Sequence, residues 1–367
     1  MRRSILSLLL LVAFASVALA DQVTLKNGDR ISGKIQSSDA KALLIKSDFA
    51  GDVTIQWDAI TGIESSDTLI LTLKDGSKLT GKITTQDGKF VVAGATNPAP
   101  ATMDNVVAVR NEIEQKNHDV EADKIAHPKL TYFWSGLIDT GLALTRGNSQ
   151  TASFTLAGKV ERDTARDKFT AYSTYVFASD DTTPPSRTTA NQLDAGFRDD
   201  YNLTPRVFVF GLVDFQTNEL QNLSLRTNFG GGLGYHVIKT DNTVFDVFAG
   251  ISYDRDSFSA YTIPGPPPVP VASLIQNSAE ALVGEEFDQK FSKRSTLTER
   301  FTFFPNLSHG GEYRMQFDTT VATQLKAWLS WQATFSDRYI SYPPPGIKGN
   351  DLLLSTGLRV TWGKVKL

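Results

Sequence analysis

The chain has no cysteine and only four histidines among its 367 residues. Without cysteine there is no disulfide framework, so stability must come from packing and sheet hydrogen bonds. A lipid-anchored N-terminus is also excluded, because it needs a cysteine at the cleavage site. The histidines are not accompanied by a cluster of other metal ligands. The sequence therefore predicts no metal site and no cofactor.

Long apolar runs are missing beyond residue 20. Val207–Val213 is among the longest runs, and it is far shorter than the ~20 residues that a spanning helix needs. Charged residues make up 21% of the chain and the formal net charge is −3. This near balance gives no reason to expect nucleic acid as a partner. A composition this polar excludes a helical membrane protein but permits a barrel, in which half of each strand faces a wet interior.

The first twenty residues have the three parts of a signal peptide. Arg2 and Arg3 form a positive segment, Ile5–Phe14 is apolar, and Ala18-Leu19-Ala20 fits the small-residue cleavage rule. We expect residues 1–20 to direct export and the mature chain to begin at Asp21. An uncleaved anchor helix is disfavoured because the apolar run is too short.

An internal repeat follows. Residues 23–35 (VTLKNGDRISGKI) and 71–83 (LTLKDGSKLTGKI) match at an offset of 48 residues. Asn27-Gly28 and Asp75-Gly76 predict type I′ hairpins, and Gly33 and Gly81 predict a bend or bulge inside a strand.

We interpret residues 21–66 and 67–110 as two small β-barrels that resemble SH3-like or Sm-like modules. Such modules bind peptides, glycans or neighbouring domains, so peptidoglycan or a periplasmic protein is the expected partner. The alternative is a structural plug or spacer. Residues 111–129 are rich in charge and predict a short helical linker that ends before Pro128.

From residue 130 to residue 367, segments of roughly 10–14 residues alternate apolar and polar side chains, which is typical of an outer-membrane barrel. Tyr313, Met315 and Phe317 alternate with Arg314 and Gln316, for example. The fold class is thus all-β, with about twelve antiparallel strands after the two small barrels and the linker. The predicted strands are 131–144, 150–162, 167–179, 188–201, 206–218, 224–238, 244–258, 273–287, 295–305, 312–325, 328–341 and 350–362.

The connections support this count. If the N-terminal repeats are periplasmic, the three longest Pro-rich connections all fall at the outer end, as expected for such barrels. Aromatic residues near the strand ends suit two interfacial girdles. Glu285 and Glu299 fall on the apolar face and require a bulge or a position near an interface. The alternative of a soluble periplasmic all-β binding protein is disfavoured, because shorter strands are typical of a soluble sandwich.

The barrel opens with residues 132–149 (YFWSGLIDTGLALTRGNS). The Gly-Leu and Gly-Asn-Ser elements of this opening resemble those of the salt-induced outer membrane protein family, a family of unknown function, over about residues 130–367. The resemblance implies an outer-membrane barrel with the N-terminal part in the periplasm and outer-membrane lipid as its surroundings. It carries no catalytic residues. The chain departs from the aromatic last residue of many such barrels, since Gly363–Leu367 follow Trp362.

Polar positions that face the interior include two blocks of opposite charge. The acidic block lies mainly on the fourth to eighth strands, and the main arginine block on the ninth to twelfth. The acidic candidates are Asp139, Asp194, Asp200, Asp214, Asp246, Asp254, Glu280 and Glu286, and the arginines are Arg300, Arg314, Arg338 and Arg359, with Arg198 and Arg226 outside that block.

Facing walls of opposite sign predict either of two interiors. They can order water in a narrow pore for small polar or charged solutes. Alternatively the charges pair, close the interior and leave a structural or anchoring barrel.

An outer-membrane lipase is the enzyme alternative, and it needs a serine and a histidine together. Ser308 and His309 are adjacent and therefore point apart, and no Gly-x-Ser-x-Gly motif occurs. We expect no enzyme activity. His236 is expected to be a polar lining residue near the inner end of the sixth strand.

Overall fold

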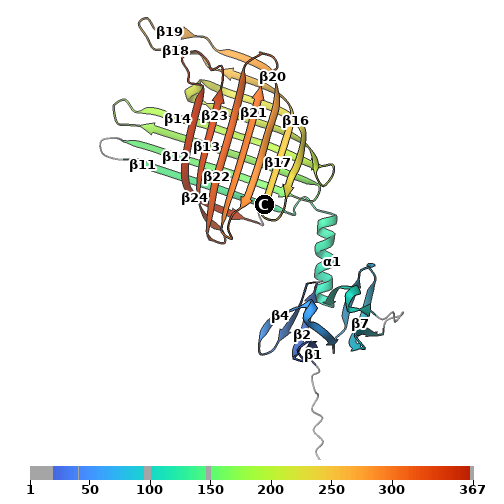
Figure 1. The fold of residues 1–367 in the computed structure, drawn as a ribbon. Helices are drawn as coiled ribbons and strands as arrows, with labels where there is room; N and C mark the ends of the chain where they lie inside the picture. The colour runs from blue at the N-terminus through green and yellow to red at the C-terminus, as the bar shows by residue number, and fades with distance from the viewer. Residues whose placement is uncertain (1–19, 40, 95–100, 146–149, 364–367) are drawn as a thin grey trace, which may run out of the picture. The chain divides into compact units, whose positions relative to one another are not determined.

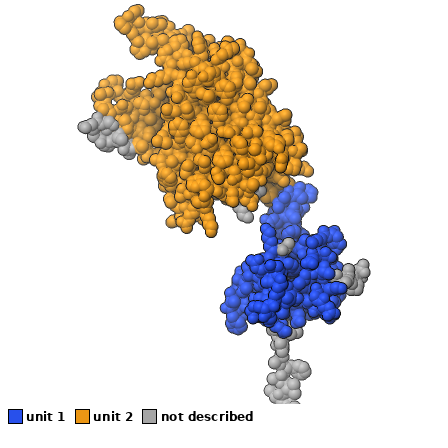
Figure 2. Space-filling view, in the orientation of Figure 1, with its two compact units in different colours: residues 1–127 blue, residues 128–367 orange. Residues whose placement is uncertain are grey.

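The computed structural model describes residues 20–39, 41–94, 101–145 and 150–363, and it divides the chain into two compact units, 1–127 and 128–367 (Figure 2). The predicted signal peptide lies outside the described residues except for Ala20. Among the described residues, no helix is both long enough and apolar enough to cross a membrane. The predicted fold class is confirmed: an antiparallel sheet and one helix precede a closed twelve-stranded antiparallel barrel.

The first unit is a ten-stranded sheet followed by the helix. Its strands are β1 (Asp21–Leu25), β2 (Arg30–Ser38), β3 (Ala42–Ser47), β4 (Gly51–Gln56), β5 (Ile60–Glu64), β6 (Leu69–Leu73), β7 (Lys78–Gln86), β8 (Lys89–Ala93), β9 (Ala101–Thr102) and β10 (Val106–Asn111). Strands β5-β1-β2-β3-β4 pair in that order, and β10-β6-β7-β8-β9 repeat the same order. The sequence repeat is therefore also a repeat of topology.

The two repeats share one hydrophobic core. Val23 and Leu71 occupy equivalent positions, as do Ile35 and Ile83, and all four are fully buried in the same cluster. The last strand of the second repeat, β10, pairs with β2 of the first. The backbone N–H of Ser65, just after β5, donates to the Ile83 carbonyl in β7. Each repeat thus completes the sheet of the other.

The hairpin turns of the repeats differ from the predicted type. In the Asn27-Gly28 and Asp75-Gly76 turns only the glycines have positive φ (84° and 82°), whereas a type I′ turn needs positive φ at both central residues. The Gly28 N–H donates to Leu25 O, and the Leu25 N–H donates to Asp29 O. This is a three-residue turn that ends in a left-handed glycine. The Asn27 side chain accepts the Asp29 N–H and so stabilises the turn locally.

Gly33 and Gly81 lie where each long strand changes partner. The first part of β7, up to Gly81, pairs with β6, and the rest pairs with β8. A Cβ at Gly81 would overlap the Ala93 carbonyl oxygen, and one at Gly33 would overlap that of Lys46. The predicted bend therefore requires glycine because two backbones approach closely.

Replacing Gly81 with alanine should lower the stability of the first unit by about 1–3 kcal/mol, the usual cost of overpacking. Thr84→Ala is the matched control, because Thr84 is exposed on the same strand. Urea unfolding of residues 21–127, which have their own core, would measure both. Equal midpoints for the two variants would contradict the close approach.

Helix α1 (Glu112–Ala126) fulfils the expectation of a short helix after the repeats. The Asn111 side chain caps it by accepting the Glu114 N–H at 2.8 Å. Lys78 of β7 pairs with Asp119 at 3.3 Å. A hydrogen bond from the Gln115 side chain, together with Lys78, lowers the pKa of the Asp119 carboxyl. The helix is thereby tied to the sheet of its own unit.

The second unit is the barrel, whose strands close in sequence order with β24 beside β11 (Figure 1). The strands are β11 (Trp134–Thr145), β12 (Thr151–Asp163), β13 (Asp167–Asp180), β14 (Arg187–Asn202), β15 (Val207–Asn218), β16 (Leu223–Lys239), β17 (Thr243–Phe258), β20 (Leu274–Lys290), β21 (Ser295–Pro305), β22 (Tyr313–Lys326), β23 (Leu329–Ile340) and β24 (Asn350–Trp362). A small hairpin, β18 (Tyr261–Ile263) and β19 (Val269–Val271), lies between β17 and β20. Each predicted strand is confirmed, and the ends differ by at most three residues.

The two ends of the barrel differ in their connections. One end, called the turn end, carries the short turns, the start of β11 and the finish of β24. The other, called the loop end, carries the longer connections, including the β18–β19 hairpin and residues 341–349. All three Pro-rich connections lie at the loop end, as the sequence predicted.

The outward face of the barrel is apolar. Exposed side chains alternate with buried ones along β15 and β17, as in Val209 beside Phe210 and Ile251 beside Ser252. Aromatic side chains gather on this face near both ends. At the turn end Trp134, Phe169 and Phe197 follow one another, and at the loop end Phe303, Tyr313 and Tyr339 do so.

Two details of the predicted strands are corrected. The first strand begins at Trp134 rather than at residue 131, because Phe133 has a left-handed φ of 66° that a strand cannot accommodate. The registers are unbroken around Glu285 and Glu299, so no bulge turns them inward. Both carboxylates remain on the outward face of their strands.

Candidate functional site in the barrel interior

The predicted interior charges all lie on the inward face of their strands. Arg314, Asp254 and Glu280 are each less than 10% exposed, whereas the outward charged residues of the same three strands are not buried. The inward set comprises Arg300, Arg314, Arg338, Arg359, Asp194, Asp200, Asp214, Asp246, Asp254 and Glu280, with Asp139, Glu286, Arg198 and Arg226. The structure brings most of them into ion pairs.

Toward the turn end, Arg198 is the centre of a packed layer. Its guanidinium pairs with Asp200 at 2.7 Å and with Glu286 at 2.9 Å. The same group lies 4.7 Å from the ring centroid of Phe210 and 4.5 Å from that of Phe248. Stacking on aromatic faces suits the weakly hydrated guanidinium. This layer, called the Arg198 layer, combines paired charge with aromatic packing.

Glycines on the inward face make room for the rings of this layer. A Cβ at Gly234 would overlap the ring of Phe208, and one at Gly284 would reach the ring of Phe248. The rings of Phe208 and Phe248 therefore pack directly against the backbone of the barrel wall, and Phe208, Phe210 and Phe248 are at most 3% exposed.

His236 lies beside the Arg198 layer, on the inward face as predicted. Its Nδ1 is 2.7 Å from Asp246 Oδ1, and its Nε2 is 3.1 Å from Asn202 Oδ1. The ring also lies 4.8 Å from the ring of Phe208. Both nitrogens have partners, so His236 is a satisfied polar lining residue.

Toward the loop end, two arginines and three carboxylates form a second cluster. Glu280 accepts two hydrogen bonds from Arg314, at 2.6 and 3.0 Å. Asp254 lies between Arg314 and Arg226, at 3.6 and 3.3 Å, and Asp256 also pairs with Arg226. All five side chains are at most 12% exposed. Each carboxylate of this cluster is thus paired with an arginine and largely buried.

The closing seam between β11 and β24 has the shortest register in the barrel, with five residue pairs from Gly136–Trp362 to Thr140–Leu358. Arg359 crosses the seam on the inside and pairs with Asp139 at 2.7 and 2.8 Å. On the outside, the ring of Trp362 covers Gly136. The seam is thus fixed on both faces.

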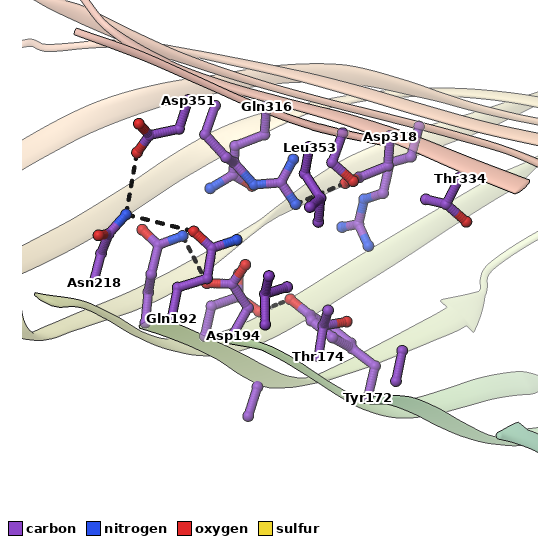
Figure 3. Close-up of a pocket in the computed structure, with 18 of the residues that line it drawn as sticks. Tyr172, Thr174, Gln192, Asp194, Asn218, Gln316, Asp318, Thr334, Asp351 and Leu353 are labelled. Carbon is purple, nitrogen blue, oxygen red and sulfur yellow. Dashed lines mark hydrogen bonds and ion pairs between the residues drawn. The ribbon is translucent and has the colours of Figure 1, made fainter. Parts of the chain in front are cut away.

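A cavity of about 400 Å³ is lined by Phe248 of the Arg198 layer and by Arg226 and Arg314 of the second cluster. Figure 3 shows its two walls: Tyr172, Gln192 and Asp194 lie on one, and Gln316 and Asp318 lie on the other. Most of its lining residues are polar, and Leu212, Phe248 and Leu282 are among the apolar ones. The barrel interior therefore combines buried clusters with open space.

A bridge crosses the interior on the loop-end side of this cavity. Asp351 of β24 accepts a hydrogen bond from Asn218 at 3.1 Å (Figure 3) and another from Gln221 at 2.5 Å. Asn218 also contacts Gln192 at 3.5 Å. These bonds join β24 to the far wall and narrow the passage toward the loops.

The inward aromatic cluster was not anticipated. The signal was present in Val207–Val213, where every residue is apolar apart from glycine. Since successive side chains point to opposite faces, such a strand must place apolar side chains inside as well as outside. Phe208, Phe210 and Leu212 are the inward members.

The residues weighed for catalysis have other partners. Ser308 Oγ accepts the Ala279 N–H at 2.9 Å, and the backbone N–H groups of Ser308 and His309 both donate to Asn306. Within the part of the chain that the structure describes, no group of three or more His, Cys, Asp or Glu residues is arranged to hold a metal ion.

A model of the family described as "Protein of unknown function, DUF481" matches residues 138–362, which is more than half of the chain and most of the barrel. The chain belongs to this family. No curated protein matches it. The family resemblance predicted from the opening residues is thus shown at this level, whereas the salt-induced description stays a prediction.

Among solved structures, this DUF481 chain is similar to the translocator domain of the autotransporter NalP from Neisseria meningitidis. The identity is 12% and the TM-score 0.38, with 69% of this chain and 95% of that chain covered. It is also similar to the NanC porin, at 10% identity and a TM-score of 0.34, covering 62% and 97%.

Proposed function

We propose that this DUF481 protein is a closed outer-membrane barrel that anchors its N-terminal sheet in the periplasm. The outward belt of apolar residues with aromatic side chains near both ends supports insertion in a bilayer. The signal peptide predicted at residues 1–20 supports export. Outer-membrane lipid is then the immediate partner of the barrel.

The burial of the Arg198 layer is the main observation that supports a barrel closed to solutes. Side chains on the wall of a wide aqueous pore are exposed to water, whereas Arg198, Phe210 and Phe248 are 3–4% exposed. Inward residues on other strands are buried too, including Glu161 at 7% and Gln332 at 2%. The ion pairs compensate the desolvation of the charges, as closure requires.

Purified full-length protein should show no stepwise conductance in planar bilayers. A Phe208→Ala/Phe248→Ala variant removes two rings from the layer. It should gain conductance, because water and ions can then pass through the barrel interior at that level. Phe197→Ala/Phe229→Ala is the matched control, since both rings are on the outward face. Heat-modifiable gel migration would verify folding. Conductance of the wild-type protein would favour the second candidate, a narrow pore for small polar solutes, which the cavity supports.

The N-terminal unit is the second part of the proposal. The identical strand order of its two repeats supports their interpretation as tandem SH3-like or Sm-like modules. Modules of that kind bind peptides or glycans, so peptidoglycan or a periplasmic protein is the proposed partner. No enzyme activity is assigned to the chain, and a lipase role for Ser308 would require its hydroxyl to leave the Ala279 N–H.

Residues 21–127 have their own hydrophobic core and are suited to a binding test on their own. They should sediment with purified peptidoglycan sacculi, and residues 128–367 in detergent should not. If neither fragment sediments, peptidoglycan is excluded and a protein partner is left.

A further inference from the structure

Of the carboxylates that line the central cavity, Asp194 and Asp214 lie side by side on neighbouring strands and have no ion pair, while Asp351 lies in the bridge to Asn218 and Gln221. Asp194 of β14 accepts a hydrogen bond from Gln216 at 2.8 Å, and Asp214 of β15 accepts one from the Tyr172 hydroxyl. Across the described residues, neither carboxylate is within ion-pair distance of a lysine or arginine. Both line the cavity. They differ in this from Asp254 and Glu280, which both form an ion pair with Arg314.

Two arginines on the opposite wall of the cavity have partly exposed side chains. Arg338 of β23 has one ion pair, with Asp318 at 2.9 Å, and Arg300 of β21 has a longer one, with Glu286 at 3.5 Å. Their side chains are 22% and 32% exposed, against 8% for Arg314. The guanidinium groups of Arg300 and Arg338 therefore present N–H donors to the cavity.

The carboxylates and arginines act on each other across the gap without contact. Arg300 and Arg338 line the same cavity as Asp194 and Asp214, and no ion pair joins the two sets across it. Opposite charges that are buried without contact lose favourable hydration, and no ion pair compensates that loss of free energy. A solute that carries both charges would complete both walls at once.

We propose that the cavity binds a small zwitterion, with its ammonium group near Asp194 and Asp214 and its carboxylate near Arg300 and Arg338. The cavity, at about 400 Å³, lies within the range of small-molecule sites. Amide and hydroxyl groups around it, such as Gln192, Thr174 and Gln316, supply orienting hydrogen bonds (Figure 3). This site goes beyond the anchoring function and does not depend on it.

A set of three four-carbon probes tests the proposal directly. Isothermal titration of purified full-length protein in detergent would compare 4-aminobutanoate, butanoate and butylammonium. We expect 4-aminobutanoate to bind at least about tenfold more tightly than either singly charged probe, because only it engages both walls. Equal affinities for the three probes, or no heat with 4-aminobutanoate, would overturn the proposal.

Two variants assign the walls. Asp194→Asn should weaken 4-aminobutanoate and butylammonium and leave butanoate unchanged, whereas Arg338→Gln should weaken 4-aminobutanoate and butanoate. Glu285→Gln, on the outward face, is the control. Asp214→Asn replaces Asp194→Asn if that variant fails to fold. An equal loss for all probes in both variants contradicts the assignment. A conducting wild-type barrel would overturn the anchoring proposal and leave this one standing.

Discussion

Replacing Glu280 with alanine is expected to lower the free energy of unfolding of the barrel by about 3–5 kcal/mol. Glu280 is 2% exposed, and its carboxylate accepts two hydrogen bonds from Arg314. Alanine would leave the Arg314 guanidinium buried in the interior with Asp254, at 3.6 Å, as its closest carboxylate. Removing one partner of a buried ion pair is strongly destabilising, because the longer contact with Asp254 does not replace the two hydrogen bonds that Arg314 loses.

Glu285→Ala on the same strand is the matched control, and its expected effect has the opposite sign. Glu285 is on the outward face, beside Val247 and Phe301. If that face contacts lipid, removing its carboxylate leaves stability unchanged or raises it. Urea unfolding of the protein reconstituted in lipid vesicles would measure both variants. A loss of less than about 1 kcal/mol for Glu280→Ala, the range of an exposed pair, would contradict the buried network.

Replacing Gly357 with valine should prevent the barrel from closing. A Cβ at Gly357 would overlap the Thr140 carbonyl oxygen of β11 and come within 2.9 Å of the Gly141 Cα. Both groups are backbone, so no side chain can turn away to relieve the overlap. The seam has five residue pairs to hold it, and the expected cost is therefore about 3 kcal/mol or more, beyond ordinary overpacking.

The measurement is heat-modifiable gel migration, which distinguishes a closed barrel from an open chain. Gly357→Val should migrate as the unfolded form even without heating. Gly211→Val is the control, since a Cβ at Gly211 has nothing within 4 Å. If both variants migrate as the folded wild-type protein does, the close approach of β11 and β24 at Gly357 is contradicted.

The alternation of side chains predicted the strands of the barrel almost to the residue, because the two faces of each strand meet different surroundings. Where alternation fails, the sequence was less informative. The apolar segment Val207–Val213 gives no sign of which face is inward, and its neighbours on β14 and β16 decide it. The start of β11 was placed too early, since nothing in the sequence marks the left-handed conformation of Phe133.

The interior charges illustrate the same division. Their inward placement followed from period two along each strand, and the sequence therefore named the residues. Their partners depend on register between strands that are far apart in the chain. Arg359 meets Asp139 only because the last strand pairs with the first, and Arg198 meets Glu286 only across the interior.

By itself, the sequence determined the all-β class, the number of barrel strands, the repeat before them and the face on which each charge lies. These depend on local periodicity, which the chain encodes residue by residue. The tertiary structure alone decided that the repeats share one core, that aromatic rings and Arg198 fill one level of the barrel, and that Asp194 and Asp214 are left without ion pairs beside a cavity. These depend on strand register and closure, which bring together residues that no local pattern relates.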